Sequence, residues 1–184
     1  MDFSWIPNAI SLMRLLMIAP IILLFVNDQF QWALLLFAIA GLSDGIDGWI
    51  AKKYDWNTRL GKFLDPAADK LLVAWSFGTL AYIGHIPAWL AVVVIGRDVV
   101  IVTGSFMYHY LVHRLEGDPT FISKFNTALE FTFLILLMLR AGFGVLDDTT
   151  ITVVGAAVLV TVVISGYDYV AGWVRGARAY RAVQ

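Results

Sequence analysis

Six stretches of apolar residues, separated by short polar turns, follow one another along the chain. A membrane-spanning helix needs about 20 mostly apolar residues. The six stretches cover residues 6–26, 32–52, 63–83, 87–108, 122–139 and 151–170. Because bilayer hydrocarbon cannot satisfy irregular backbone, this pattern predicts an all-α integral membrane protein built as a bundle of six transmembrane helices. We expect residues 1–184 to form a single membrane domain.

The composition agrees with a membrane protein. Hydrophobic residues make up 60% of the 184 residues, whereas soluble domains contain roughly 45–50%. The formal net charge is −1, which argues against nucleic acid as a partner and leaves membrane lipids as the expected surroundings. The chain contains no cysteine, so it has no disulfide framework, thiolate metal ligand or thiol nucleophile.

The basic residues predict the orientation of the bundle, because cytoplasmic loops are enriched in Lys and Arg. Six spans place the second gap, the fourth gap and the tail on one side of the membrane. These segments and their flanks hold nine of the 13 basic residues: Lys52, Lys53, Arg59, Lys62, Arg114, Lys124, Arg175, Arg178 and Arg181. The opposite side holds Arg140. We therefore expect both termini and the loop after the second span in the cytoplasm, with the protein in a bacterial-type inner membrane.

Four aspartates occupy the facing ends of the second and third predicted spans. Asp44 and Asp47 are spaced i,i+3, and Asp65 and Asp69 are spaced i,i+4, so each pair lies on one helix face. A loop of about ten residues brings the two faces together. Carboxylates are costly in lipid, but a cluster of them suits hard cations such as Mg²⁺ or Mn²⁺. The sequence therefore predicts metal-assisted chemistry on a charged substrate at the membrane surface.

The spacing of these residues resembles the signature of the CDP-alcohol phosphotransferases, D-x2-D-G-x2-A-R-x8-G-x3-D-x3-D. The matching positions are Asp44, Asp47, Gly48, Ala51, Lys52, Gly61, Asp65 and Asp69. Lys52 departs from the pattern, since the family usually has Arg there; the charge is kept but bidentate phosphate binding is lost. Two later segments, 96–100 and 119–127, are most similar to cardiolipin synthases of the CMP-forming type.

The resemblance implies transfer of a phosphatidyl group from CDP-diacylglycerol to an alcohol, with CMP as leaving group. It implies two divalent cations, Mg²⁺ or Mn²⁺, held by the aspartates, with Asp69 acting as both ligand and general base. It assigns CDP binding to Asp44, Gly48, Lys52 and Gly61. It also implies a homodimer.

The acceptor alcohol is less defined by the sequence. The first interpretation is phosphatidylglycerol, which gives cardiolipin; the alternative is glycerol 3-phosphate, which gives phosphatidylglycerophosphate. Basic side chains are candidates for the acceptor phosphate: Arg14, Arg59, Lys62, Arg97 and Lys124.

Structural roles are the alternatives for three of these basic residues. Arg14 could extend to the membrane interface, Arg97 could neutralise Asp98 within one helix, and Lys124 could be a positive-inside anchor. A different class of protein, an ion-coupled transporter, would also contain intramembrane acids. That class is disfavoured because the acids gather at one membrane face beside a basic loop, with no pair of broken helices.

The departure at Lys52 generates a prediction. We expect Lys52→Arg to retain activity, because the guanidinium keeps the charge and restores a bidentate phosphate contact. The measurement is the KM for CDP-diacylglycerol in purified enzyme. A large rise in KM would contradict the assignment of this position to the donor phosphates.

Overall fold

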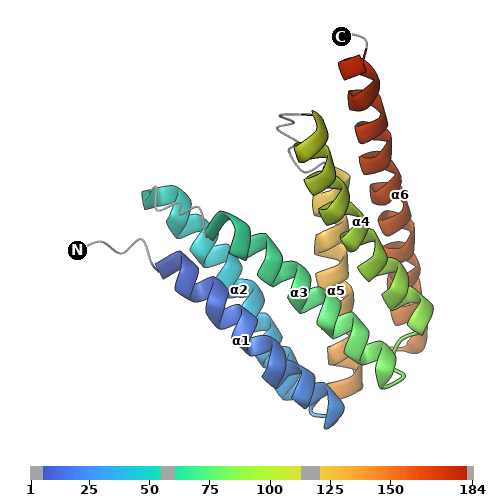
Figure 1. Ribbon diagram of the computed structural model, residues 1–184. Coiled ribbons are helices and arrows are strands. Elements are labelled where there is room, and N and C mark those ends of the chain that lie inside the picture. The colour runs from blue at the N-terminus through green and yellow to red at the C-terminus, as the bar shows by residue number, and fades with distance from the viewer. Residues whose placement is uncertain (1–5, 55–60, 113–120, 182–184) are drawn as a thin grey trace.

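The computed structural model describes the backbone of residues 6–54, 61–112 and 121–181, and the side chains within residues 9–43, 67–104 and 121–173. All regular structure in these ranges is helical (Figure 1). The six helices are α1 (Ile6–Val26), α2 (Phe30–Tyr54), α3 (Gly61–Tyr82), α4 (Ala88–Val112), α5 (Phe121–Phe143) and α6 (Asp148–Arg181). The prediction of an all-α fold is confirmed for these residues.

The helix boundaries follow the apolar pattern closely at some ends and not at others. The first predicted span, 6–26, coincides with α1. The last predicted span, 151–170, is too short, because α6 continues to Arg181. A search for apolar residues ends where the basic tail begins, whereas backbone hydrogen bonding continues through polar residues.

Tight turns separate the described helices where the sequence contains turn residues. Asp28 between α1 and α2 has φ of 56°, and Gly84 between α3 and α4 has φ of 82°. At the start of α6 the Thr150 hydroxyl donates a hydrogen bond to the Asp147 carboxylate, which lowers the pKa of that carboxyl. Asp147 thus acts as a polar cap where the helix begins.

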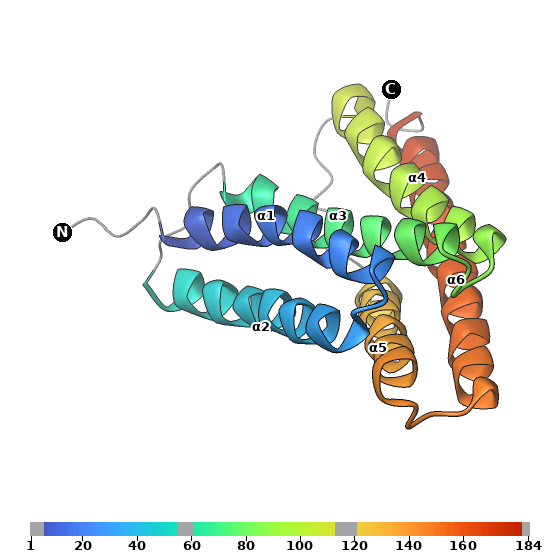
Figure 2. The ribbon, with the colours of Figure 1, turned by 90° about the horizontal axis from the view of Figure 1, so that it is seen from below.

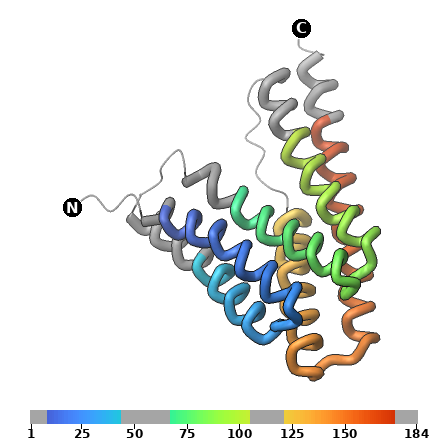
Figure 3. The backbone as a smooth tube through the Cα atoms, turned by 60° about the horizontal axis from the view of Figure 1, so that its bottom comes forward, coloured from blue at the N-terminus to red at the C-terminus, as the bar shows by residue number. Residues whose placement is uncertain are grey.

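The helices form two groups that meet at an angle. α1 packs on both α2 and α3, while α6 packs on both α4 and α5. α3 contacts α4, and α2 contacts α5, so these two pairs join the groups. Figures 2 and 3 show that the axes of α1, α2 and α3 are inclined to the axes of α4 and α6. The apolar core lies where the groups meet, with the ring of Phe77 on α3 stacked on Phe133 of α5 at 5.7 Å.

Three helical segments in the described part of the chain are long and apolar enough to cross a membrane: Ala9–Val26, Phe121–Phe143 and Asp148–Trp173. The described part of α2 is apolar over Phe30–Ser43. The predicted bundle of six spans is therefore supported in part. For α2, α3 and α4 the described side chains cover only part of each helix, and α2 and α3 hold the four aspartates.

Candidate active site

The aspartate motif lies on two helices that follow one another in the chain. Asp44 and Asp47 belong to α2, and Asp65 and Asp69 belong to the N-terminal half of α3. Of the four aspartates, Asp69 is the one whose side chain the structure describes. The other candidate residues of α2 and the start of α3 have side chains outside the described ones: Asp44, Asp47, Gly48, Lys52, Gly61, Lys62 and Asp65. Arg59 falls outside the described residues. The expected four-carboxylate cluster remains a prediction.

Asp69 is held by a buried arginine from another helix. Arg14 Nη1 on α1 lies 2.5 Å from Asp69 Oδ1 on α3. The Arg14 side chain is fully buried, whereas that of Asp69 is 26% exposed. An ion pair with one buried partner is far less screened than a pair at the surface. Arg14 therefore fixes the orientation of a carboxylate that still reaches the surface.

The same arginine also contacts α2. Arg14 Nε donates a hydrogen bond of 3.2 Å to the carbonyl oxygen of Ala40. One guanidinium thereby links α1 with α2 and α3, the two helices that carry the aspartate motif. This burial answers one question left by the sequence: the Arg14 side chain packs inside the bundle instead of extending to the membrane interface.

A second set of polar contacts begins at the next residue of α3. Lys70 Nζ lies 2.7 Å from Asp98 Oδ1 on α4, and the neighbouring Arg97 Nη1 lies 2.5 Å from the same oxygen. Arg97 Nη2 also donates hydrogen bonds to the hydroxyls of Ser123 on α5, at 2.9 Å, and Ser165 on α6, at 2.5 Å. Arg97 thus neutralises Asp98 and joins α4 to α5 and α6. An acceptor contact by Arg97 remains a prediction.

A polar chain inside α5 and α6 was not anticipated from the sequence. Thr161 on α6 donates to Asn126 Oδ1 at 2.8 Å, and Asn126 Nδ2 donates to Glu130 Oε1 at 2.6 Å. Asn126 and Glu130 are both buried. Their i,i+4 spacing on one helix face was the available signal. The contact to α6, however, joins residues far apart in the sequence.

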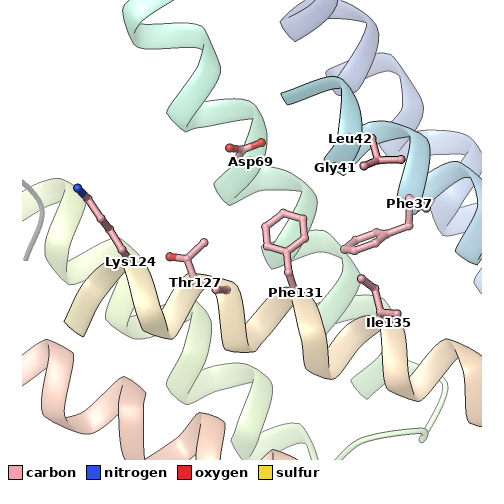
Figure 4. A pocket seen from close by; sticks show the side chains of 10 residues that line it. Phe37, Gly41, Leu42, Asp69, Lys124, Thr127, Phe131 and Ile135 are labelled. Atoms are coloured by element: carbon pink, nitrogen blue, oxygen red, sulfur yellow. The ribbon is translucent and has the colours of Figure 1, made fainter. Parts of the chain in front are cut away.

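A cavity of about 560 Å³ lies beside Asp69, between α2 and α5. Figure 4 shows Asp69 on α3 across from Thr127 and Phe131 of α5, with Lys124 towards one end and Phe37 and Ile135 towards the other. Asp69 and Lys124, two of the residues that the sequence singled out, therefore line the same cavity. The apolar lining was not anticipated, because it depends on which faces of α2 and α5 meet.

The fold and these contacts define a helical membrane protein with an acidic group beside a lateral cavity. Residues 4–181 match the sequence profile of the CDP-alcohol phosphatidyltransferases. The chain belongs to this family.

Relatives with two different printed activities resemble the chain. Human cardiolipin synthase (CMP-forming) is 32% identical over 89% of this chain and 60% of the relative. A CDP-diacylglycerol–glycerol-3-phosphate 3-phosphatidyltransferase from Pseudomonas fluorescens is 41% identical over 72% of this chain and 71% of the relative. The enzyme of that name from Aquifex aeolicus is 29% identical over 89% and 93%. The chain spans about 60% of the length of the human and rat cardiolipin synthases.

Members of this family are generally metal-dependent. Among the described residues no three acidic, histidine or cysteine side chains gather as a metal site. The donor set of the motif nevertheless fits Mg²⁺ or Mn²⁺, since all four side chains are carboxylates and hard cations prefer oxygen. Asp69 contributes a partly exposed carboxylate to this set.

The Arg14–Asp69 pair generates a prediction. Arg14→Gln should lower the free energy of unfolding by about 3 kcal/mol, because breaking a buried pair leaves a charge uncompensated. In the double variant Arg14→Gln/Asp69→Asn the two losses should be clearly less than additive. The measurement is denaturant unfolding in detergent micelles.

Arg140→Gln is the matched control. It breaks the pair between Arg140 and Asp148, whose aspartate is 80% exposed, so we expect a change below about 0.5 kcal/mol. If Arg14 instead served mainly as a phosphate contact, Arg14→Gln would raise a substrate KM and leave stability unchanged.

Proposed function

We propose that this chain is a cardiolipin synthase of the CMP-forming type. It transfers the phosphatidyl group of CDP-diacylglycerol to a free glycerol hydroxyl of phosphatidylglycerol and releases CMP. The observation that carries the proposal is the position of Asp69, a motif carboxylate, at the polar end of an apolar cavity suited to a lipid.

The chemistry follows from the motif. Asp69 accepts the proton of the acceptor hydroxyl, while the hydroxyl oxygen forms a bond to the β-phosphorus of the donor. The bond from that phosphorus to the bridging oxygen breaks, and CMP leaves. General-base catalysis of this kind contributes about 10²–10⁴-fold. Two divalent cations, held by Asp44, Asp47, Asp65 and Asp69, would neutralise the donor diphosphate.

The other residues of the site have supporting roles in this proposal. Arg14 orients the Asp69 carboxylate through their 2.5 Å contact. Lys52 neutralises a donor phosphate, and Gly48 and Gly61 allow the nucleotide to approach the backbone. Lys124 lies on the rim of the same cavity as Asp69, which suits a contact to the acceptor phosphate.

The proposal also includes the membrane arrangement. All six helices cross or enter the bilayer, the aspartates and both termini face the cytoplasm, and the protein is a homodimer. The distribution of Lys and Arg supports this orientation. The three apolar helices α1, α5 and α6 support the location in a membrane.

Phosphatidylglycerophosphate synthase is the second candidate, favoured by the 41% identity to the Pseudomonas fluorescens enzyme. The experiment gives purified protein CDP-diacylglycerol with either phosphatidylglycerol or glycerol 3-phosphate. We expect cardiolipin and CMP from the first mixture and little CMP from the second. Product formed only with glycerol 3-phosphate would overturn the proposal.

A variant tests the base. Asp69→Asn should lower kcat by at least about 10²-fold, since the amide cannot accept the proton, while CDP-diacylglycerol binding persists because three carboxylates remain. Asp148→Asn, an exposed change on α6, is the control and should retain activity. Near-normal turnover by Asp69→Asn would remove Asp69 from the base role.

A further inference from the structure

The cavity between α2 and α5 is apolar over most of its surface. Its volume of about 560 Å³ lies within the roughly 300–1,000 Å³ of ligand pockets. Much of the lining is apolar and consists of Phe37, Leu42, Phe131 and Ile135. Towards one end lie three polar residues, Asp69, Lys124 and Thr127 (Figure 4). We propose that this cavity binds one acyl chain of the acceptor lipid, with the lipid phosphate at Lys124 and the hydroxyl at Asp69.

Short side chains keep the cavity open. Ala38 and Gly41 on α2 and Ala128 on α5 belong to its lining. A Cβ atom placed on Gly41 would lie 3.8 Å from Phe131 Cε1, which is ordinary contact. Any longer side chain at Gly41 would therefore extend into the space that the acyl chain needs.

The rim of the cavity faces outward. Leu42 is 69% exposed, and Lys124 and Ala128 are also exposed. Within the described part of the chain, the opening thus lies on the side of the bundle. A lipid can enter such an opening from the bilayer without leaving its apolar surroundings.

The position of Asp69 and the charge of Lys124 suit the acceptor. In the proposed chemistry Asp69 takes a proton from the acceptor hydroxyl, so an acceptor whose acyl chain fills the cavity has its hydroxyl beside the base. The motif residues assigned to the donor, Asp44 and Gly48, follow Gly41 in the sequence of α2. Lys124 supplies one positive charge, which matches the single phosphate of phosphatidylglycerol better than a diphosphate.

The cavity acts mainly by orienting the acceptor. Bilayer hydrocarbon is as apolar as the cavity wall, so an acyl chain gains little from the transfer itself. Packing against Phe37 and Phe131, whose ring centroids lie 5.4 Å apart, holds the chain in register with Asp69. Filling the cavity should therefore affect acceptors with long chains more than acceptors with short chains.

The experiment compares Gly41→Leu with wild-type enzyme in detergent, using dioleoyl and dihexanoyl phosphatidylglycerol. We expect Gly41→Leu to raise the KM for the dioleoyl acceptor about tenfold, since overfilling of this size costs 1–3 kcal/mol. The KM for the dihexanoyl acceptor and for CDP-diacylglycerol should stay within about twofold of wild type. Gly78→Leu on α3, where a Cβ meets nothing within 4 Å, is the matched control.

The results distinguish the acceptor lipid from the donor lipid as the occupant of the cavity. Equal effects on both acceptors, or no effect, would overturn the proposal. A rise in the KM for CDP-diacylglycerol instead would assign the cavity to the donor and would also overturn it. Ala38→Leu repeats the test from the same helix, and thermal unfolding of each variant identifies one that has failed to fold.

The inference rests on the proposed function, so a second measurement is independent of turnover. Phosphatidylglycerol with a diazirine at the end of one acyl chain should label peptides of α2 and α5 in wild type and in Gly78→Leu, but not in Gly41→Leu. Labelling at these helices without turnover would refute the proposed function and keep the lipid site. Turnover with labelling confined to other helices would refute the site and keep the function.

Discussion

Charged side chains inside an apolar bundle must be paired, and this requirement organises the protein. A charge at the centre of a bilayer costs at least about 2.5–3.5 kcal/mol. α3 carries two adjacent charges of opposite sign, Asp69 and Lys70, and neighbouring residues on a helix point in different directions. Asp69 contacts Arg14 on α1, and Lys70 contacts Asp98 on α4. α3 is thereby tied by ion pairs to both groups of helices.

This arrangement connects stability with chemistry. The carboxylate assigned as the base is also the partner of the buried Arg14, whose Nε contacts the backbone of α2 at Ala40. A group that is fixed by a fold contact needs little rearrangement when substrate arrives, which favours catalysis. The same contacts link a basic residue of the first helix to the two helices that carry the motif.

Local patterns predicted the helices and the motif, but not the contacts between helices. Apolar runs of bilayer length gave α1 with its observed bounds, because an apolar segment and a helix coincide there. They missed the end of α6, where polar residues continue the helix to Arg181. Arg14 and Asp69 are 55 residues apart in sequence, and periodicity within one helix carries no signal for such a pair. The cavity was missed for the same reason, since Gly41 and Phe131 become neighbours only when α2 packs on α5.

The lateral cavity bears on the choice between the two acceptors. A small anion such as glycerol 3-phosphate reaches a site from water and is bound by charges and hydrogen bonds. It has no apolar chain that would pack against Phe37, Phe131 and Ile135 in the cavity lining. A phospholipid enters from the bilayer, and its headgroup needs a polar end beside an apolar passage. In the proposed site Asp69 on α3 and Lys124 on α5 supply that end, and short side chains at Ala38, Gly41 and Ala128 line the passage between α2 and α5. Under the proposed function, acceptor choice thus depends on helix packing as well as on the charges of the motif.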